Sequence, residues 1–248
     1  MDKNGLYNKI IIFGIIILLT GTCIIPATGS IIQKQASSNG QLYLENIIYV
    51  DDDNTEGPWD GTIEHPYLYI QEGIYHADHG DTVYVFSGTY YNQYAYIDKT
   101  INLIGEDKET TMIYTGSTWW IVEIYADNVN VSGFTFRNNG FAEFNEKMYI
   151  EADYCTISDN IFADERSFNC LCTLKLNDSH HNVITRNRFG VLTSQLFCIY
   201  LENSNYNTIS ENKFRLKIVT MQIKNSNTNI IIDNTFIVAA GNTARSGA

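Results

Sequence analysis

The chain has 248 residues, with 16 Lys or Arg against 28 Asp or Glu, so its formal net charge is −12 at pH 7. This acidic balance argues against nucleic acid as a partner, because phosphate binding needs clustered basic residues. Apolar residues make up 44% of the chain, which is enough for a core and excludes a largely disordered protein.

An export signal is the first predicted element, over residues 1–29. Lys3 and Lys9 form a short positive region, and residues 10–25 are almost uninterrupted apolar residues. Small residues such as Ala27 then occupy the positions that a signal peptidase recognises. The apolar run is short for a helix that spans a membrane. We therefore expect a secreted or cell-surface protein, with an uncleaved N-terminal anchor in a membrane as the alternative.

A strand and a short helix open the folded region. Residues 47–50 are β-branched and aromatic, which is typical of a strand. In residues 69–77, the side chains of Ile70, Ile74 and Ala77 share one helical face. Such a helix would close one end of an apolar stack, and repeat folds require a closed end of this kind.

Internal repeats dominate the rest of the chain. Five segments align without gaps, and their terminal Phe residues are 26, 27, 25 and 22 positions apart. The segments are residues 129–136, 155–162, 182–189, 207–214 and 229–236. Apolar residues alternate within each turn and are then interrupted by turn residues, which indicates short strands with one buried face. This period fits one turn of a parallel β-helix, in which three short strands stack on the next turn.

Asparagines recur in two columns of this alignment. They are Asn182, Asn207 and Asn229 in one column, and Asn160, Asn187, Asn212 and Asn234 in the other. Asn tolerates the left-handed backbone of a tight corner, so we expect these residues to occupy such corners. Their stacked side-chain amides would hydrogen-bond along each column.

The opening segments carry the most specific motif of the chain. It runs through "IQEGI" at residues 70–74, "GDTVYVFSGTYY" at 80–91 and "IDKTINLIGE" at 97–106, and then into the Asn-rich repeats. This order resembles the right-handed parallel β-helix (pectin-lyase-like) superfamily, and within it the exported NosD-like repeat proteins. The resemblance implies a fold and not an activity, since the superfamily includes esterases, lyases, hydrolases and adhesins. The catalytic motifs of pectin esterases and polygalacturonases find no match in the sequence.

The predicted organisation is a signal over residues 1–29, a linker over 30–46, an all-β single-stranded right-handed parallel β-helix over 47–240 with an N-terminal capping helix, and a tail over 241–248. The repeats stop abruptly and no polar final turn follows them. Because terminal repeats normally carry a cap, we expect the sequence to be a fragment of a longer protein.

Candidate ligand-binding residues are those that alternate with inward residues on one sheet: Tyr149, Glu151, Lys175, Tyr200 and Glu202. Tyrosine rings stack on sugar faces, and carboxylates accept hydrogen bonds from sugar hydroxyls. Glu151 and Glu202 share a column with one turn between them, so their backbones lie roughly 9–10 Å apart. That separation is near the upper limit for an inverting glycosidase.

The functional prediction is a non-catalytic secreted or cell-surface module that binds polysaccharide or another surface component. One alternative is a carbohydrate-active enzyme, such as a polysaccharide lyase, esterase or hydrolase, and no catalytic residue is assigned. The other alternative is a structural spacer in a larger surface protein. Binding tests, substrate panels and a longer reading frame would separate the three.

No metal site or cofactor is predicted. Asp51 and Asp53 have the alternating spacing that begins a calcium loop, but Gly is missing from the sixth position and Glu from the twelfth. Bound calcium and simple turn hydrogen bonds both stay open there. The five histidines are scattered, and copper would need His, Met and Cys to converge. The resemblance to NosD-like proteins is therefore not extended to copper binding.

Cysteines and glycosylation sequons complete the inventory. After the signal, Cys155, Cys170, Cys172 and Cys198 remain, and buried thiols are expected although an exported chain permits disulfides. Sequons occur at Asn130 and Asn177, and their use depends on the host.

Overall fold

The computed structural model describes residues 34–36, 42–115, 120–138, 147–163, 172–190, 197–216 and 221–238. The chain divides into two compact units, residues 1–45 and 46–248. In the first unit, β1 (Lys34–Ala36) pairs antiparallel with β2 (Leu42–Leu44), inside the stretch predicted as a linker. The predicted signal and the 241–248 tail lie outside the described residues. Across the described ranges, no helix has the length and apolarity needed to cross a membrane.

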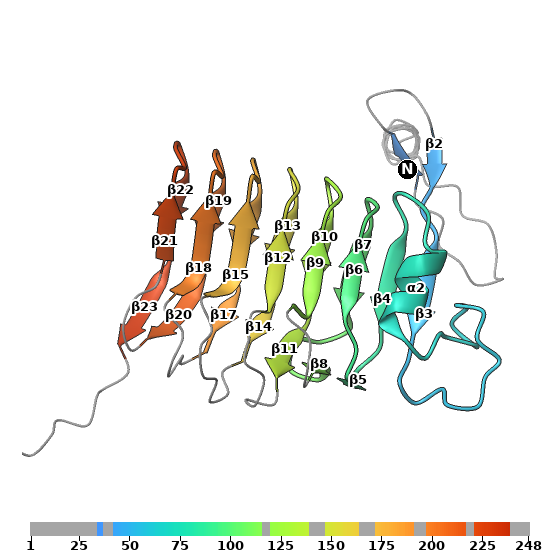
Figure 1. Ribbon diagram of the computed structural model, residues 1–248. Helices are drawn as coiled ribbons and strands as arrows, with labels where there is room; N and C mark the ends of the chain where they lie inside the picture. The colour runs from blue at the N-terminus through green and yellow to red at the C-terminus, as the bar shows by residue number, and fades with distance from the viewer. Residues whose placement is uncertain are drawn as a thin grey trace, which may run out of the picture. The chain divides into compact units, whose positions relative to one another are not determined.

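The second unit is a coil of three parallel sheets (Figure 1). Sheet 1 contains β3 (Ile47–Val50), β4 (Thr82–Val85), β7 (Asn102–Gly105), β10 (Asn130–Ser132), β13 (Thr156–Ser158), β16 (Val183–Thr185), β19 (Thr208–Ser210) and β22 (Ile230–Ile232). Sheet 2 contains β5 (Gly88–Tyr91), β8 (Thr111–Thr115), β11 (Thr135–Asn138), β14 (Ile161–Phe162), β17 (Arg188–Phe189), β20 (Lys213–Leu216) and β23 (Thr235–Val238). Sheet 3 contains β6 (Ala95–Ile97), β9 (Val122–Ile124), β12 (Met148–Ile150), β15 (Cys172–Asn177), β18 (Phe197–Glu202) and β21 (Met221–Lys224). From β4 onward the chain visits the three sheets in this order in successive turns, which confirms the predicted parallel β-helix.

Inward residues of successive turns lie directly above one another. Val131 pairs with Ile157, Ile157 with Ile184, and Ile184 with Ile209, and all four are fully buried. This register places residues some two dozen positions apart in contact, as the repeat predicts. The buried area of such columns supplies the main stabilisation of the coil, because apolar burial is worth about 25 cal/mol per Å².

Phenylalanines form a second inward column in sheet 2. The ring centroids of Phe136 and Phe162 are 5.3 Å apart, those of Phe162 and Phe189 are 4.7 Å apart, and those of Phe189 and Phe214 are 4.7 Å apart. Phe236 continues the column at 5.2 Å from Phe214. The last three pairs are nearly parallel, with interplanar angles of 7°, 12° and 9°. Each aromatic pair contributes about 0.5–1.5 kcal/mol beyond its area burial.

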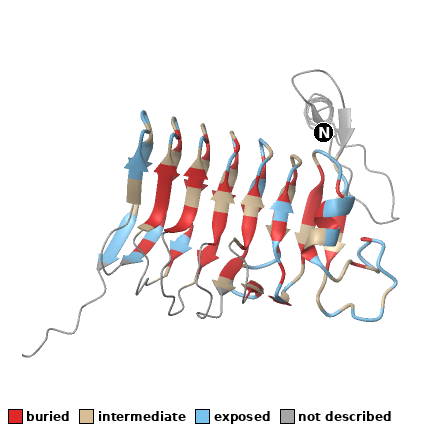
Figure 2. Cartoon of the chain, viewed as in Figure 1, coloured by how far each residue is buried: buried red, intermediate tan, exposed pale blue. Residues whose placement is uncertain are grey.

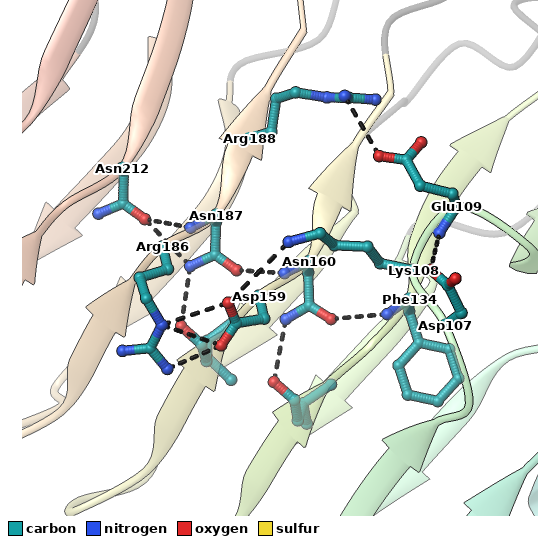
Figure 3. A network of polar contacts seen from close by, with 12 residues as sticks. Asp107, Lys108, Glu109, Phe134, Asp159, Asn160, Arg186, Asn187, Arg188 and Asn212 are labelled. Carbon is teal, nitrogen blue, oxygen red and sulfur yellow. Dashed lines mark hydrogen bonds and ion pairs between the residues drawn. The ribbon is translucent and has the colours of Figure 1, made fainter.

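The asparagine columns hold the corners together by hydrogen bonds. The Asn187 Oδ1 accepts from the backbone N–H of Asn160 at 3.0 Å, and its Nδ2 donates to the carbonyl of Ile157 at 2.8 Å (Figure 3). Each asparagine thus satisfies one donor and one acceptor of the preceding turn that no strand neighbour reaches. The second column repeats this arrangement, with Asn207 Oδ1 accepting from the N–H of Asn182 at 2.8 Å.

The prediction that these asparagines adopt the left-handed backbone is wrong. The left-handed residues are the ones immediately before them, with φ of 56° at Asp159, 54° at Arg186, 58° at His181 and 60° at Tyr206. At each corner, the residue that follows the left-handed one points its side chain inward. A small side-chain amide in that position bonds one backbone N–H and one backbone C=O group of the preceding turn. The predicted hydrogen bonding along the column is confirmed, since Asn187 Nδ2 also lies 3.1 Å from the Oδ1 of the next asparagine.

A short helix, α2 (Ile70–His76), covers the first turns of the coil (Figure 1). Ile70, Ile74 and Ala77 are buried, as their common face predicts. A Cβ atom at Gly73 would lie 2.7 Å from a methyl of Val50, so the glycine allows the helix to approach the coil closely.

Side chains tie α2 to the edge of sheet 3. The Gln71 amide accepts from the backbone N–H of Tyr96 at 2.8 Å and donates to its carbonyl at 3.2 Å. This pairing protects the exposed edge of β6, as an additional strand would. Lys99 Nζ donates to the carbonyl of Ala77 at 2.9 Å, which satisfies an acceptor at the end of the helix. The predicted N-terminal cap is therefore confirmed.

The last described turn is exposed (Figure 2). Ile231 and Phe236 continue the inward columns, yet 43% and 49% of their surfaces are accessible to solvent. The corresponding residues one turn earlier, Ile209 and Phe214, are fully buried.

Candidate ligand-binding face on sheet 3

The outward residues of sheet 3 form two neighbouring columns along the coil. The first column, set by the strand register, is Tyr96, Glu123, Tyr149, Lys175, Tyr200 and Gln222. The second column contains the residues two positions later in the chain. They are Asp98, Tyr125, Glu151, Asn177, Glu202 and Lys224. All five residues predicted to bind a ligand stand in these columns. Their binding role stays a prediction.

Aromatic side chains fill the first three turns of this face. We call Tyr96, Trp120, Tyr125 and Tyr149 the aromatic strip. The ring centroids of Tyr96 and Tyr125 are 5.3 Å apart, those of Tyr125 and Tyr149 are 5.9 Å apart, and those of Trp120 and Tyr149 are 5.2 Å apart. Tyr96 and Tyr125 are 41% and 39% exposed. The strip therefore presents an accessible, nearly continuous aromatic surface on a rigid sheet.

Carboxylates anchor two tyrosines of the strip. The Tyr149 hydroxyl donates to Glu151 at 2.7 Å, and the Tyr125 hydroxyl donates to Glu123 at 2.9 Å. Burial and the bond to Glu123 raise the pKa of Tyr125 to about 12, and burial with Glu151 raises the pKa of Tyr149 as well. Both hydroxyls stay protonated near neutral pH, so the carboxylates keep their remaining lone pairs for other donors.

The next three turns carry an ion network instead. Glu202 lies between two lysines, 3.2 Å from Lys175 Nζ and 2.6 Å from Lys224 Nζ. The bonds to Lys224 and then Lys175 lower the pKa of Glu202. The Lys175 ammonium also lies 5.9 Å from the ring centroid of Tyr149 and 5.4 Å from that of Tyr200, which is within reach of a cation–π interaction.

Two predicted residues sit differently from what a sugar platform needs. Tyr200 lies on the same face but only 7% of its surface is exposed, so it offers no open ring. Glu202 is held as an ion pair, and a lowered pKa is the opposite of what a general acid requires. Glu151 and Glu202 thus have separate partners, the Tyr149 hydroxyl for Glu151 and two lysines for Glu202.

Tyr96, Trp120 and Tyr125 extend the predicted site and were not among its candidates. All three precede the first aligned repeat segment, which begins at residue 129. Tyr96 stands two residues before Asp98 in an alternating run, and that alternation was the available signal.

The Asp51–Asp53 turn serves a structural purpose in the fold. The Asp51 carboxylate accepts from the backbone N–H of Asp53 at 3.0 Å, and Asp52 accepts from the N–H of Thr89 at 2.9 Å. Burial raises the pKa of Asp52. A Cβ atom on Gly88 would clash with the Asp52 carboxylate, so this turn requires glycine opposite it.

The described cysteines are buried, as predicted for Cys155, Cys172 and Cys198. Burial raises the pKa of the Cys155 thiol to about 11, which makes it a poor nucleophile near neutral pH. Cys170 lies outside the described residues. Asn130 is exposed, and its amide donates to the Oδ1 of Asn102 at 2.7 Å, while glycosylation at either sequon stays a prediction.

The three parallel sheets define a pectin-lyase-like β-helix protein. Residues 76–247 match the family model described as "Periplasmic copper-binding protein (NosD)". Because the match covers more than half of the chain, the chain belongs to the NosD family. The periplasmic description agrees with the predicted location outside the cytoplasm. A search of curated proteins found no match.

Three solved structures are similar to this chain to different degrees. One is named "a putative glycosyl hydrolase from Parabacteroides merdae", with a TM-score of 0.52, 9% identity, and coverage of 64% of this chain and 83% of that chain. Pectin methylesterase from carrot has a TM-score of 0.32, 12% identity, and coverage of 79% and 89%. The PL6 family alginate lyase AlyGC has a TM-score of 0.24, 14% identity, and coverage of 84% and 47%. At these identities the first likeness establishes the fold alone, and the other two carry no argument.

The described residues do not fit a copper site. They contain no group of three or more His, Cys, Asp or Glu side chains placed to hold a metal ion. The Nδ1 atom of His180 accepts from the backbone N–H of Asn205 at 3.1 Å, and that of His79 accepts from the N–H of Thr100 at 3.2 Å. His181 is stacked between two parallel tyrosine rings at 4.9 and 5.0 Å. These imidazoles have structural partners and do not converge.

Proposed function

We propose that this protein is an exported, non-catalytic module that binds polysaccharide through the aromatic strip on sheet 3. The observation that carries the proposal is the line of rings from Tyr96 through Tyr125 to Tyr149, spaced 5.3 and 5.9 Å apart on consecutive turns. A polymer with repeated apolar faces matches such a line better than a small solute does.

Physical chemistry favours a sugar on this surface. Aromatic rings bury a large apolar area at a small cost in side-chain entropy, and sugar rings have apolar C–H faces. Glu123 and Glu151 flank the rings and accept hydrogen bonds from hydroxyl groups. Because the rings stand on paired strands, little ordering is needed when a ligand binds.

Binding is a better proposal than catalysis for this face. Hydrolysis needs a carboxyl group kept protonated as an acid, and the lysines beside Glu202 favour its ionised form. The predicted export signal and the family's periplasmic description both support a location where extracellular polysaccharides occur. A role as a passive spacer would leave the exposed rings of the strip without a purpose.

Affinity electrophoresis and calorimetry on a panel of soluble polysaccharides test the proposal. We expect at least one polymer to bind, and Tyr125→Ala and Tyr149→Ala each to weaken it by about tenfold, which is about 1.4 kcal/mol. Tyr154→Ala is the matched control, since this tyrosine is 55% exposed but lies in the corner between β12 and β13, outside the aromatic strip. Absence of binding across the panel, or full binding by both strip variants, contradicts the proposal.

A further inference from the structure

We infer that the aromatic strip takes an uncharged polysaccharide and rejects polyuronates. This inference rests on the proposed function and names the chemical class of its ligand. It follows from the distribution of charge among the turns of sheet 3.

Tyrosines and carboxylates alternate over the first three turns. In the first column Glu123 stands between two tyrosines, and in the second column Tyr125 stands between Asp98 and Glu151. Every ring of the strip that contacts a ligand would therefore bring that ligand beside a carboxylate. A polymer with a carboxylate on each sugar would place like charges together at each turn.

Lysines that adjoin the strip are already engaged. Lys175 pairs with Glu202 at 3.2 Å, on the side of the ion network. Lys99 donates to the carbonyls of Tyr75 and Ala77 at 3.1 and 2.9 Å, within the helix cap. Both lysines are therefore committed to other groups, Lys175 to the Glu202 carboxylate and Lys99 to the carbonyls at the end of the helix.

The net charge reinforces this electrostatic bias. The whole chain carries a formal charge of −12, so its long-range field also repels polyanions. A neutral sugar avoids both effects and still donates its hydroxyl groups to the carboxylates.

The geometry also sets the direction of the polymer. The strip crosses β6, β9 and β12, which lie side by side in successive turns (Figure 1). A bound chain would therefore run along the coil axis, perpendicular to the strands. Such a polymer meets the three carboxylates in succession, which multiplies the discrimination against uronic acids.

Two matched polymer pairs test the inference: polygalacturonate against its fully methyl-esterified form, and carboxymethyl cellulose against hydroxyethyl cellulose. At low salt we expect the neutral member of at least one pair to bind at least tenfold more tightly, and Tyr125→Ala to weaken that binding by about tenfold. The double variant Glu123→Gln, Glu151→Gln should reduce the difference in affinity between the neutral and the anionic polymer. Added salt should reduce the same difference. Circular dichroism checks that the variants stay folded.

The outcomes separate the two proposals. Equal or tighter binding of the anionic members, dependent on Tyr125, overturns the inference but leaves the proposed function standing. Chitosan that binds tenfold more tightly than its N-acetylated form would also overturn it, in favour of a cation-binding face. If no polymer of any charge binds, the proposed function fails, and the inference fails with it.

Discussion

The inside of the coil and the outer face of sheet 3 are built on the same strands, yet they repeat in different ways. Inside, Val131, Ile157, Ile184 and Ile209 are interchangeable apolar residues in one column. Outside, the first column of sheet 3 changes from Glu123 to Tyr149 to Lys175 over three consecutive turns. Packing constrains the inner column, because each side chain must fill the same space as its neighbour above.

This difference indicates where function can differ between proteins of one fold. A uniform inner column fixes the spacing of the turns and gives no chemical choice. The outer columns inherit that spacing, and hydrogen bonds to Glu123 and Glu151 anchor the rings of Tyr125 and Tyr149, whose centroids lie 5.9 Å apart. The scaffold thus sets the distances, and the outward residues set the chemistry.

Phe189→Ala is the change that should damage the inner columns most. Phe189 is fully buried between Phe162 and Phe214, with both centroid distances at 4.7 Å. Its removal leaves a cavity that the stacked turns cannot close, so we expect a loss of about 3–5 kcal/mol in the free energy of unfolding. Urea titration followed by circular dichroism measures it. Arg188→Ala, an exposed change on the same strand, should be nearly neutral, and equal losses for both would contradict the packing argument.

Asn187→Ala tests the corners of the coil. The change would leave the N–H of Asn160 and the carbonyl of Ile157 buried without their partners. We expect a cost of about 1–3 kcal/mol for each orphaned group, measured by the same titration.

The matched control for this corner is Arg186→Lys, one residue away and exposed. Arg186 bonds Asp159 through Nη2 at 2.7 Å on the surface (Figure 3). Surface ion pairs contribute little, so this variant should stay within about 0.5 kcal/mol of the original. A larger loss for Arg186→Lys than for Asn187→Ala would show that the surface ion pairs, and not the buried amides, hold the corner.

The repeat period made the inner columns predictable. Once the coil is assumed, the repeat length gives the register between strands of successive turns. The alternation of apolar and polar residues then assigns each residue to the inner or the outer face. The choice between Asp159 and Asn160 as the left-handed residue did not follow, since both residue types tolerate that backbone. Only the three-dimensional corner decides which of the two points inward to meet buried N–H and C=O groups.

The candidate face was predictable in part. Tyr149 and Glu151 follow from alternation around the repeated inward residues. Tyr96 and Trp120 precede the regular repeats, so the alignment could not place them. The burial of Tyr200 and the pairing of Glu202 with two lysines depend on side-chain packing between turns, which no one-dimensional pattern encodes.

Cys155→Asn should extend the buried column of Asn182 and Asn207 by one turn. Cys155 stands where the next turns carry Asn182 and Asn207, and its thiol contacts the carbonyl of Ala126 at 3.4 Å and the N–H of Val129. An asparagine would replace these weak sulfur contacts with two amide hydrogen bonds. We expect stabilisation by about 1 kcal/mol in urea titration. Cys155→Ala is the control and should destabilise, whereas a loss with asparagine would contradict the proposed role of the column.

Glu202→Gln should have the smallest effect, because the Glu202 ion network lies on the outer face. The pKa of Glu202 is lowered by Lys224 and Lys175, so its stabilising effect is present above the ordinary value of 4.5 and is lost as the pH falls through the folded-state pKa. We expect a slightly lower urea midpoint for the variant at neutral pH, and equal midpoints once the pH is well below the folded-state pKa of Glu202. High salt should also remove the difference, since exposed pairs are screened. Glu64→Gln, an exposed change outside sheet 3, controls for net charge. A difference that persists in acid would show that Glu202 acts through packing and not through charge.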